Sequence, residues 1–370
     1  MNKNQTYLPG NHPNLPPPPG TVGFAAWIKN NLFSDVKNTI LTILCMYLLF
    51  SFVNAAIGWF VLDSVVFAES KRDCLKINDG ACWAVISKRV GQFFYGFYPV
   101  EERWRPNLCF IMMFFAVMPL LYDKVIYRKQ LLYFSLSFPF LTYILLTGGV
   151  FGIEPVDTSK FGGFMLTVII GVTGIAVSLP IGVLLSLGRQ SNLFAVRILS
   201  IFFIEFMRGV PLITLLFVAS TMLNYFLPPG TSFDLLMRVL IMVTLFSAAY
   251  IAEVVRGGIQ AIPKGQYEAA QALGLSYWQT TRFITLPQAL KISIPGIVNT
   301  FIGLYKDTTL VVIIGLMDPL GIGRAALADS KWNGLSREVY LFISLFYFFS
   351  CFAMSRYSLW LEKKLSTEQK

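Results

Sequence analysis

The stretch FMLTVIIGVTGIAVSLPIGVLLSL, residues 164–187, contains no charged side chain and is long enough to cross a lipid bilayer. A transmembrane helix needs about 20 predominantly apolar residues, because each residue adds only about 1.5 Å to its length. The whole chain shares this character: 55% of its 370 residues are hydrophobic, 14% are charged, and the mean hydropathy is +0.62. Soluble chains carry about 25% charged residues, so the composition indicates a membrane protein with several spans.

Seven further apolar runs lie along the chain, and we therefore expect an all-α, polytopic bundle of about eight transmembrane helices. Apolar residues dominate positions 39–61, 108–122, 131–151, 164–187, 210–227, 235–254, 294–316 and 339–361. Residues 1–38 begin without an apolar stretch and include the motif LPPPPG, which is typical of a disordered tail rather than a signal peptide. We expect this tail and lead-in, and the short tail 363–370, to be cytoplasmic.

The distribution of Lys and Arg predicts the orientation of the chain, since these residues concentrate in cytoplasmic loops. If both termini are cytoplasmic, the inner loops and tails hold more Lys and Arg than the outer loops, whose bases lie mostly in the long segment 62–107. We therefore expect segment 62–107 outside the cytoplasm and the polar segment 255–293 inside it. Bases spread among loops do not form the basic face of a nucleic-acid-binding protein.

Two cysteines, Cys74 and Cys82, lie in the outer segment within the stretch CLKINDGAC. An oxidising compartment would allow a disulfide between them, and two free thiols near the membrane surface are the alternative. The chain has five cysteines and one histidine, and its sequence contains no zinc-site spacing, no nucleophile–base pair and no P-loop. We therefore expect no catalytic residue, no metal site and no cofactor bound to this chain.

The polar stretch EAAQALGLSYWQTTRFITLPQAL, residues 268–290, interrupts the apolar pattern between two runs. Its alanines favour a first short helix, which Gly274 is expected to end in the left-handed conformation. Ser276 and Gln279 have the spacing of a capping box, which predicts a second short helix that is limited by Pro287. A helix–turn–helix on the inner face suits a docking site for a soluble protein; a helical hairpin without a partner is the alternative.

Four blocks of residues, taken in order, resemble ABC importer permeases of the polar amino-acid (HisM-like) subfamily. The EAA loop of that family corresponds here to Glu268, Ala269, Ala270, Gly274, Ile284, Leu286 and Pro287. The other blocks are FMRGVPLITLLF at 206–217, AAYIAEVVRGGIQAIPKGQ at 248–266 and KDTTL at 306–310. The extra N-terminal residues, with GACWAVI at 80–86, resemble the longer permease subunit of general L-amino-acid importers of Gram-negative bacteria, the Aap/Bzt type.

The resemblance implies a permease core of five spans at residues 161–362, preceded by extra spans at 39–160 with a periplasmic loop at 62–107. The EAA residues would contact a separate ATPase through the cytoplasmic coupling loop 255–293. The complex would also contain a second, non-identical permease and a periplasmic amino-acid-binding protein, and two ATPase subunits would bind ATP and magnesium. The implied function is import of L-amino acids, mainly polar ones, across the bacterial inner membrane, with no catalysis in this chain.

Ionisable residues within apolar runs are costly in lipid and are therefore candidates for function. Lys306 and Asp307 lie inside the run 294–316 and, together with Thr308, are candidates for the substrate pathway. The alternative is an ion pair that only holds two helices together. Glu253 and Arg256 are three residues apart and can pair on one helix face beside segment 255–293, where we expect them to support the coupling region.

Two other functions are compatible with the composition. An ion-coupled secondary transporter or channel would use Asp307 as its coupling carboxylate, but such proteins usually carry two internal repeats, and the sequence has one EAA-like block. A membrane scaffold without transport activity would not need charge in the middle of a span. The sequence therefore favours the ABC permease.

Overall fold

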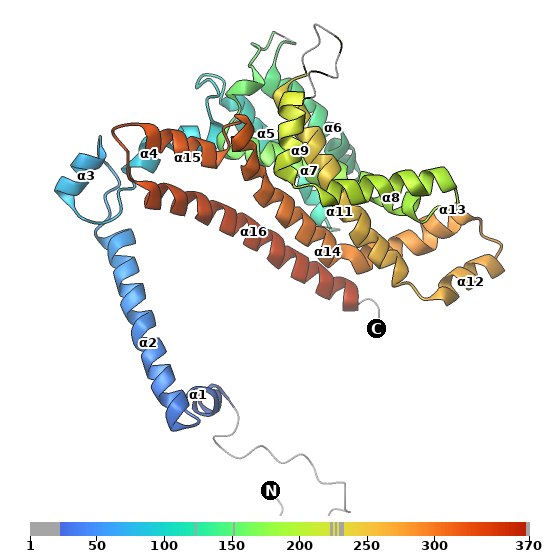
Figure 1. The fold of residues 1–370 in the computed structure, drawn as a ribbon, viewed down its shortest axis with the longest axis horizontal. Coiled ribbons are helices and arrows are strands. Elements are labelled where there is room, and N and C mark those ends of the chain that lie inside the picture. The colour runs from blue at the N-terminus through green and yellow to red at the C-terminus, as the bar shows by residue number, and fades with distance from the viewer. Residues whose placement is uncertain are drawn as a thin grey trace, which may run out of the picture. The chain divides into compact units, whose positions relative to one another are not determined.

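The computed structural model describes residues 23–122, 124–150, 152–222, 225, 228 and 233–367. Within these ranges every regular element is helical and β contacts are limited to isolated bridges, which confirms the all-α prediction (Figure 1). Most of the expected N-terminal tail, residues 1–22, lies outside the described part, as do residues 368–370. The chain divides into two compact units, residues 1–66 with 73–82, and residues 67–72 with 83–370.

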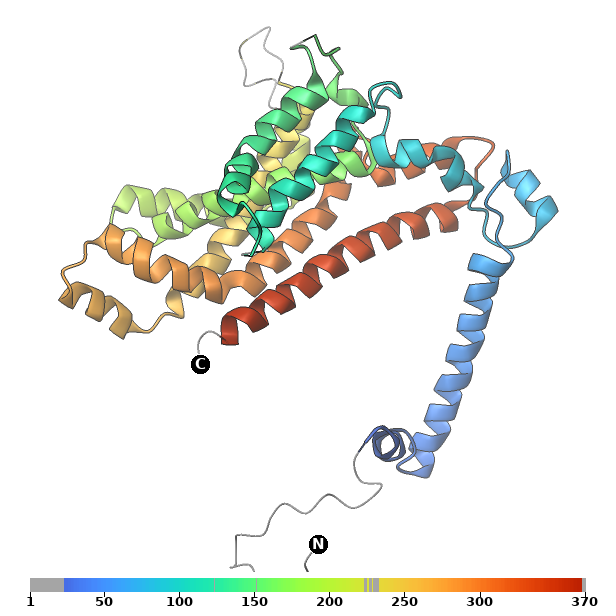
Figure 2. The same cartoon turned by 180° about the vertical axis from the view of Figure 1, so that it is seen from behind.

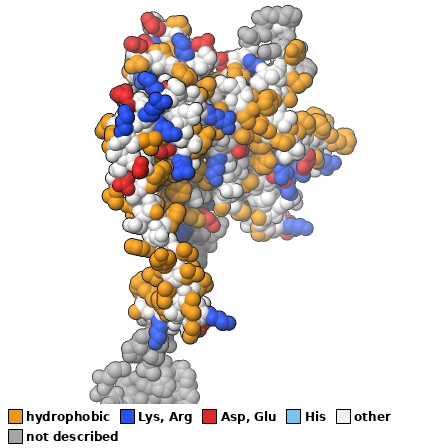
Figure 3. All heavy atoms as spheres, turned by 60° about the vertical axis from the view of Figure 1, so that its left-hand side comes forward, with side chains coloured by type: hydrophobic (Ala, Val, Ile, Leu, Met, Phe, Trp, Pro, Cys, Tyr) orange, Lys and Arg blue, Asp and Glu red, His pale blue; other side chains and the backbone are white. Residues whose placement is uncertain are grey.

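The first unit is built around one long apolar helix. It contains α1 (Phe24–Leu32), α2 (Val36–Ile57), the π-helical continuation η1 (Gly58–Leu62) and most of α3 (Lys71–Ile77). Asp35 caps α2 by accepting a hydrogen bond of 2.8 Å from the backbone N–H of Asn38. No side chain of α2 is buried, and hydrophobic side chains cover its surface in Figure 3, as expected for a helix surrounded by lipid or by another chain.

The second unit holds the helices from α4 onwards. In chain order they are α4 (Ala84–Tyr95), α5 (Trp104–Leu121), α6 (Arg128–Thr147), η2 (Thr158–Lys160), α7 (Gly163–Arg189), α8 (Phe194–Gly209), α9 (Leu212–Phe217), η3 (Val218–Met222), α11 (Leu235–Gln260), α12 (Lys264–Ala272), α13 (Tyr277–Thr280), η4 (Thr281–Thr285), α14 (Leu286–Asp307), η5 (Thr308–Ile314), α15 (Pro319–Ala328) and α16 (Ser336–Thr367). Helices α12 and α13 lie at one end of this unit and α4 and α15 lie at the opposite end (Figure 1, Figure 2).

Helix α11 is central to the second unit, where it packs against both α7 and α14. The approach to α7 is close, because a Cβ atom added to Gly182 would come within 2.7 Å of the Cγ2 atom of Ile251. Small residues allow such close approach between helices in membranes. Leu166, Val239 and Leu304 come from the three helices and meet in the main buried cluster. A movement of α11 would therefore displace side chains of both α7 and α14.

The described helices confirm the prediction of about eight spans. Seven are long and apolar enough to cross a membrane, and the count rises to eight if α8 and the segment Leu212–Met222 form one bent span. The prediction of a separate span at 210–227 needs correction, because the preceding residues form α8 and the chain then turns by 101°. The turn lies at Pro211, which has no backbone N–H with which to continue the helix.

Candidate functional site

The polar segment forms a helical hairpin, residues 264–290, which we call the EAA hairpin. Its first helix, α12, ends at Ala272, and Gly274 follows with φ of +70°, a left-handed conformation that favours glycine. The backbone N–H of Gly274 donates to the carbonyl of Gln271 at 2.9 Å, and that of Leu275 donates to the carbonyl of Ala270 at 3.1 Å. These bonds satisfy the last carbonyls of α12 and hold the turn tightly.

Ser276 begins the second helix of the EAA hairpin. Its hydroxyl oxygen accepts a hydrogen bond from the Gln279 N–H (3.4 Å), and its own N–H donates to the Gln279 side chain (2.9 Å), which completes a capping box. The prediction of a short second helix is wrong. The helix continues through η4 and α14 as one segment, Tyr277–Ile314. Pro287 does not end it, since proline is accommodated in the first turn of α14, directly after the π-helical turn η4.

The seven EAA residues lie together on this hairpin and differ in burial. Glu268, Ala269, Gly274 and Pro287 are exposed, Ile284 and Leu286 are half-buried, and Ala270 is buried. The hairpin also exposes large hydrophobic side chains, with 77% of Leu273 and 69% of Trp278 accessible, beside Tyr277 and Phe283. Exposed apolar groups gathered on a polar segment mark a surface for contact with another protein or with the membrane.

Five charged side chains meet beside the EAA hairpin and form what we call the ion cluster. Arg189, at the end of α7, lies 2.7 Å from Glu205 of α8 and 2.9 Å from Glu253 of α11. Arg256 lies 3.0 Å from Glu253, so the structure brings together the pair expected from the sequence. Arg208 lies 3.9 Å from Glu253 and 4.0 Å from Glu205. The ion pairs thus connect α7, α8 and α11 near the point where α11 ends and α12 follows.

Arg189 was not among the residues that the sequence analysis selected. It lies at the end of an apolar run, where an arginine is ordinarily a boundary residue, and its two partners come from later helices. The sequence signal that could have found it is weak: Glu205 lies between two predicted spans, and Glu253 lies at the end of a third. Arg256 also donates to the side chain of Gln260 at 2.7 Å, which extends the ion cluster toward the EAA hairpin.

The three candidates for the substrate pathway lie where α14 passes into η5. Lys306 is exposed, Asp307 is half-buried and Thr308 is buried. The Thr308 hydroxyl donates to the carbonyl of Tyr305 at 2.8 Å and lies 3.5 Å from the phenol oxygen of Tyr347 on α16. Neither Lys306 nor Asp307 forms an ion pair with a residue in the described ranges.

Cys74 and Cys82 are joined by a disulfide within the first unit, with their Cα atoms 5.8 Å apart. Both cysteines are buried. The backbone around them is held by hydrogen bonds from the Val65 N–H to the carbonyl of Ala81 and from the Ala81 N–H to the carbonyl of Trp59, each 2.8 Å long. Elsewhere, the described residues contain no group of three or more His, Cys, Asp or Glu side chains that could hold a metal ion.

Comparison with known proteins shows similarity along almost the whole chain. The glutamate/glutamine/aspartate/asparagine transport system permease protein BztC of Rhodobacter capsulatus is 44% identical, with 96% of each chain covered. The inner membrane amino-acid ABC transporter permease protein YhdY of Escherichia coli is 46% identical, with 96% of this chain and 97% of that protein covered. A crystal structure of an amino acid ABC transporter with histidines is 26% identical over 54% of this chain and 91% of its own, with a TM-score of 0.49.

A family match gives the same assignment as BztC and YhdY and confirms the resemblance drawn from the sequence blocks. Residues 178–367, which include α8, α11, the EAA hairpin and α14, match the family described as binding-protein-dependent transport system inner membrane component. The chain therefore belongs to this family of inner-membrane permease subunits of ABC transporters.

Proposed function

We propose that this chain is the permease of an ATP-driven importer that moves polar L-amino acids from the periplasm to the cytoplasm. The observation that carries the proposal is the 44% identity with BztC over 96% of both chains, since BztC is named for glutamate, glutamine, aspartate and asparagine. The match extends beyond the residues of the family match, 178–367, into the N-terminal spans. The substrates of this chain are therefore proposed to be acidic amino acids and their amides.

The proposed complex contains a second, non-identical permease, two ATPase subunits and a periplasmic amino-acid-binding protein. ATP and magnesium bind to the ATPase subunits. Both termini of this chain are cytoplasmic, residues 39–160 form extra spans, and residues 161–362 form the permease core. Reporter fusions at residues 20 and 370 test this orientation: both should report a cytoplasmic location, and a periplasmic location of either end would contradict it.

The EAA hairpin is proposed to carry motion from the ATPase into the membrane. It is continuous with α11 on one side and with α14 on the other, so a displacement of its tip acts on two spans at once. The ion cluster connects the same end of α11 to α7 and α8. Coupling between two sites requires a contact whose free energy differs between two conformations, and the exposed Leu273 and Trp278 supply the apolar surface for that contact.

Lys306 and Asp307 are proposed to lie on the substrate pathway. A free amino acid carries one carboxylate and one ammonium group, which complement the ammonium of Lys306 and the carboxylate of Asp307. Neither side chain is neutralised by another described residue, and an unpaired charge within a span is costly, so its presence there points to a function. The buried Thr308 fixes the backbone at this point through its bond to the carbonyl of Tyr305.

Uptake by the reconstituted importer tests the proposed function. Proteoliposomes that contain the two permeases, the ATPases and the binding protein are supplied with labelled glutamate, glutamine, aspartate and asparagine, with labelled leucine as the comparison. We expect uptake of the four polar amino acids that requires ATP on the ATPase side and persists without an ion gradient. Uptake that follows an imposed ion gradient in the absence of the ATPases would instead identify a secondary transporter.

A further inference from the structure

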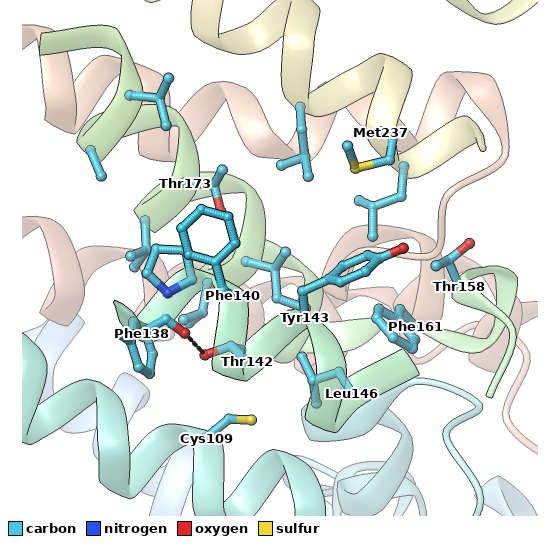
Figure 4. A pocket seen from close by; sticks show the side chains of 18 of the residues that line it. Cys109, Phe138, Phe140, Thr142, Tyr143, Leu146, Thr158, Phe161, Thr173 and Met237 are labelled. Atoms are coloured by element: carbon cyan, nitrogen blue, oxygen red, sulfur yellow. Dashed lines mark hydrogen bonds between the residues drawn. The ribbon is translucent and has the colours of Figure 1, made fainter. Parts of the chain in front are cut away.

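A cavity of about 840 Å³ separates the helical hairpin α5–α6 from α7 and α11 in the second unit. Figure 4 shows aromatic and aliphatic side chains around it, including Phe138, Phe140 and Tyr143 from α6 and Met237 from α11. Cys109 of α5 and Thr173 of α7 complete the walls (Figure 4). All four helices are candidate membrane spans, so this cavity lies at the depth of the lipid hydrocarbon.

The hairpin α5–α6 contacts the rest of the second unit at both of its ends, and the cavity lies between these contacts. At one end, the Tyr98 hydroxyl donates to the carbonyl of Leu146 at 2.9 Å and its ring packs 5.6 Å from that of Phe161. At the other end, the ring of Tyr122 lies 6.1 Å from Tyr357 and 5.9 Å from Trp360, both on α16. The cavity between these attachments is therefore a stable feature of the unit rather than a consequence of a detached hairpin.

The cavity opens on the surface of the unit. Several of its lining side chains are exposed, among them Phe140, Tyr143, Val177 and Ile241. In a membrane these side chains face the bilayer, so the acyl chains of lipids are in direct contact with the opening. An empty apolar cavity would forfeit dispersion contacts along its whole wall, and a hydrocarbon chain restores them.

One end of the cavity is polar. Thr158 and Asp234 both line it, and the Thr158 hydroxyl donates to a carboxylate oxygen of Asp234. The other carboxylate oxygen accepts from the Met237 N–H at 3.0 Å and so caps α11. In Figure 4 the phenol oxygen of Tyr143 points toward this same end, where Thr158 lies. Polar groups at one end of an apolar cavity match an amphiphile whose head group lies at that end.

The charges at this end favour an ammonium head group. Asp234 is exposed and forms no ion pair with a residue in the described ranges, so its negative charge is available. The turn that bears Thr158 also carries Asp157 and Lys160, both exposed, whereas Arg238, one helical turn after Asp234, is buried and donates to the carbonyl of Ser220 at 2.6 Å. The exposed charges at this end are therefore two carboxylates and one ammonium. Lys160 suits a lipid phosphate, whereas two carboxylates repel an anionic head group and attract a cationic one.

We propose that the cavity binds an acyl chain of a phospholipid with a primary ammonium head group, of the phosphatidylethanolamine class, with the ammonium beside Asp234. The lipid fills the space between the hairpin α5–α6 and α7–α11 and joins them. This site does not depend on which amino acid the protein transports.

Lipid binding to the purified full-length chain tests the proposal. The protein is stripped of lipid in detergent and titrated with phosphatidylethanolamine or phosphatidylglycerol of identical acyl chains, and bound lipid is counted by native mass spectrometry. We expect wild-type protein to retain phosphatidylethanolamine in preference to phosphatidylglycerol. The Asp234→Asn variant keeps a capping oxygen for α11, so it should fold and lose this preference by about two- to fivefold, the factor of an exposed ion pair.

Two further variants test the cavity itself. Ala176→Phe and Thr173→Phe each place a ring in the cavity from α7 and should reduce retention of both lipids. Leu184→Phe is the matched control, since Leu184 is on the same helix, is 67% exposed and does not line the cavity. Retention in both filled variants equal to that of Leu184→Phe would overturn the cavity assignment. An unchanged lipid preference in Asp234→Asn, or no preference in wild type, would overturn the head-group assignment.

Discussion

The guanidinium of Arg189 lies 2.9 Å from the carboxylate of Glu253, which joins the end of α7 to α11 directly beside the EAA hairpin. The same guanidinium donates a hydrogen bond of 2.7 Å to Glu205 of α8. Both Arg189 and Glu253 are partly screened from solvent, so the pair is stronger than an ion pair at an open surface. Rigid-body rotations of domains about an interface repack the salt bridges at that interface, and the ion cluster lies where such a rotation of α11 would act.

Replacing Arg189 should uncouple α7 from the hairpin without unfolding the chain. In Arg189→Gln, Glu253 keeps its pairing with Arg256 at 3.0 Å, so the loss of stability should be about 1 kcal/mol. We expect several-fold lower amino-acid uptake at an unchanged amount of assembled complex. Uptake and thermal unfolding of the purified complex measure the two effects.

Arg197→Gln is the matched control for this change. Arg197 is exposed on α8 and forms no ion pair with a described residue. Its uptake should equal that of wild type. Equal uptake by both variants would show that the ion cluster has no part in transport.

Lys306→Met and Asp307→Asn should lower uptake while the complex still assembles. Each variant removes one charge that no described residue neutralises, and neither removes the Thr308 bond that holds the local backbone. The measurements are uptake, subunit composition after purification, and ATP hydrolysis stimulated by the binding protein. Wild-type uptake in both variants would exclude these residues from the substrate pathway, and loss of assembly would instead assign them a structural role.

The disulfide between Cys74 and Cys82 should protect both thiols from chemical modification. A membrane-impermeant maleimide added to intact cells should label neither cysteine before reduction and both after it. Replacing both residues by serine should destabilise the loop by about 2 kcal/mol, since the closed loop is short. Labelling of both thiols without a reductant would show that the bond is not formed in the cell.

Asp318 predicts a pH dependence of stability with a definite sign. It is fully buried at the start of α15, where one carboxylate oxygen accepts from the Gly321 N–H at 2.8 Å and the other has no hydrogen-bond partner in the described structure. Burial raises the pKa of Asp318 from 3.8 to about 6. The folded state holds the Asp318 proton more tightly than the unfolded state does. The stability that this proton contributes is therefore full below about pH 4 and is lost as the pH rises through 6.

Asp318→Asn should therefore stabilise the protein at neutral pH. Asparagine retains an oxygen for the Gly321 N–H and carries no charge, so its advantage over wild type should grow from pH 5 to pH 7.5, to at most about 3 kcal/mol. Asp329→Asn should instead destabilise the protein by an amount that stays constant from pH 5 to pH 7.5, since the Lys331 N–H and Arg89 lower the pKa of Asp329 and its contribution is lost only below about pH 4. Thermal unfolding across this pH range measures both. A pH-independent difference for Asp318→Asn would contradict the assigned burial of charge.

Local features of the site could be predicted from the sequence because they depend on neighbouring residues. The left-handed Gly274 and the capping box of Ser276 and Gln279 each follow from residue types at fixed spacing within one turn of helix. The pairing of Glu253 with Arg256 follows from a spacing of three on one helix. The apolar runs likewise predicted the spans, since membrane insertion depends on composition.

Features that depend on tertiary contacts could not be predicted in this way. The pairing of Arg189 with Glu253 requires α7 and α11 to lie side by side, which no local pattern specifies. Pro287 was expected to limit a helix, but the π-helical turn before it let the helix continue into α14. Residues 194–209, which the apolar pattern does not predict as a span, form α8, and Pro211 turns the chain at the start of the predicted run 210–227.

The EAA hairpin is proposed to transmit the ATPase cycle, and Gly274 is its most sensitive position. The left-handed φ of Gly274 means that any side chain there costs about 1 kcal/mol or more, and an added carboxylate also projects from the tip. Gly265→Asp is the matched control, since Gly265 lies in the first turn of α12, where its φ is not left-handed and Asp is favourable. Glu268→Lys should have a milder effect than Gly274→Asp, because Glu268 is exposed.

The most direct test is reconstitution of the complete importer with each variant, in which bound ATPase, ATP hydrolysis stimulated by the binding protein, and amino-acid uptake are measured on the same preparation. We predict that Gly274→Asp abolishes uptake and either releases the ATPase or frees its hydrolysis from control by the binding protein, whereas Gly265→Asp keeps most of all three. If Gly274→Asp retains wild-type values in all three measurements, the EAA hairpin is only a polar connector between α11 and α14.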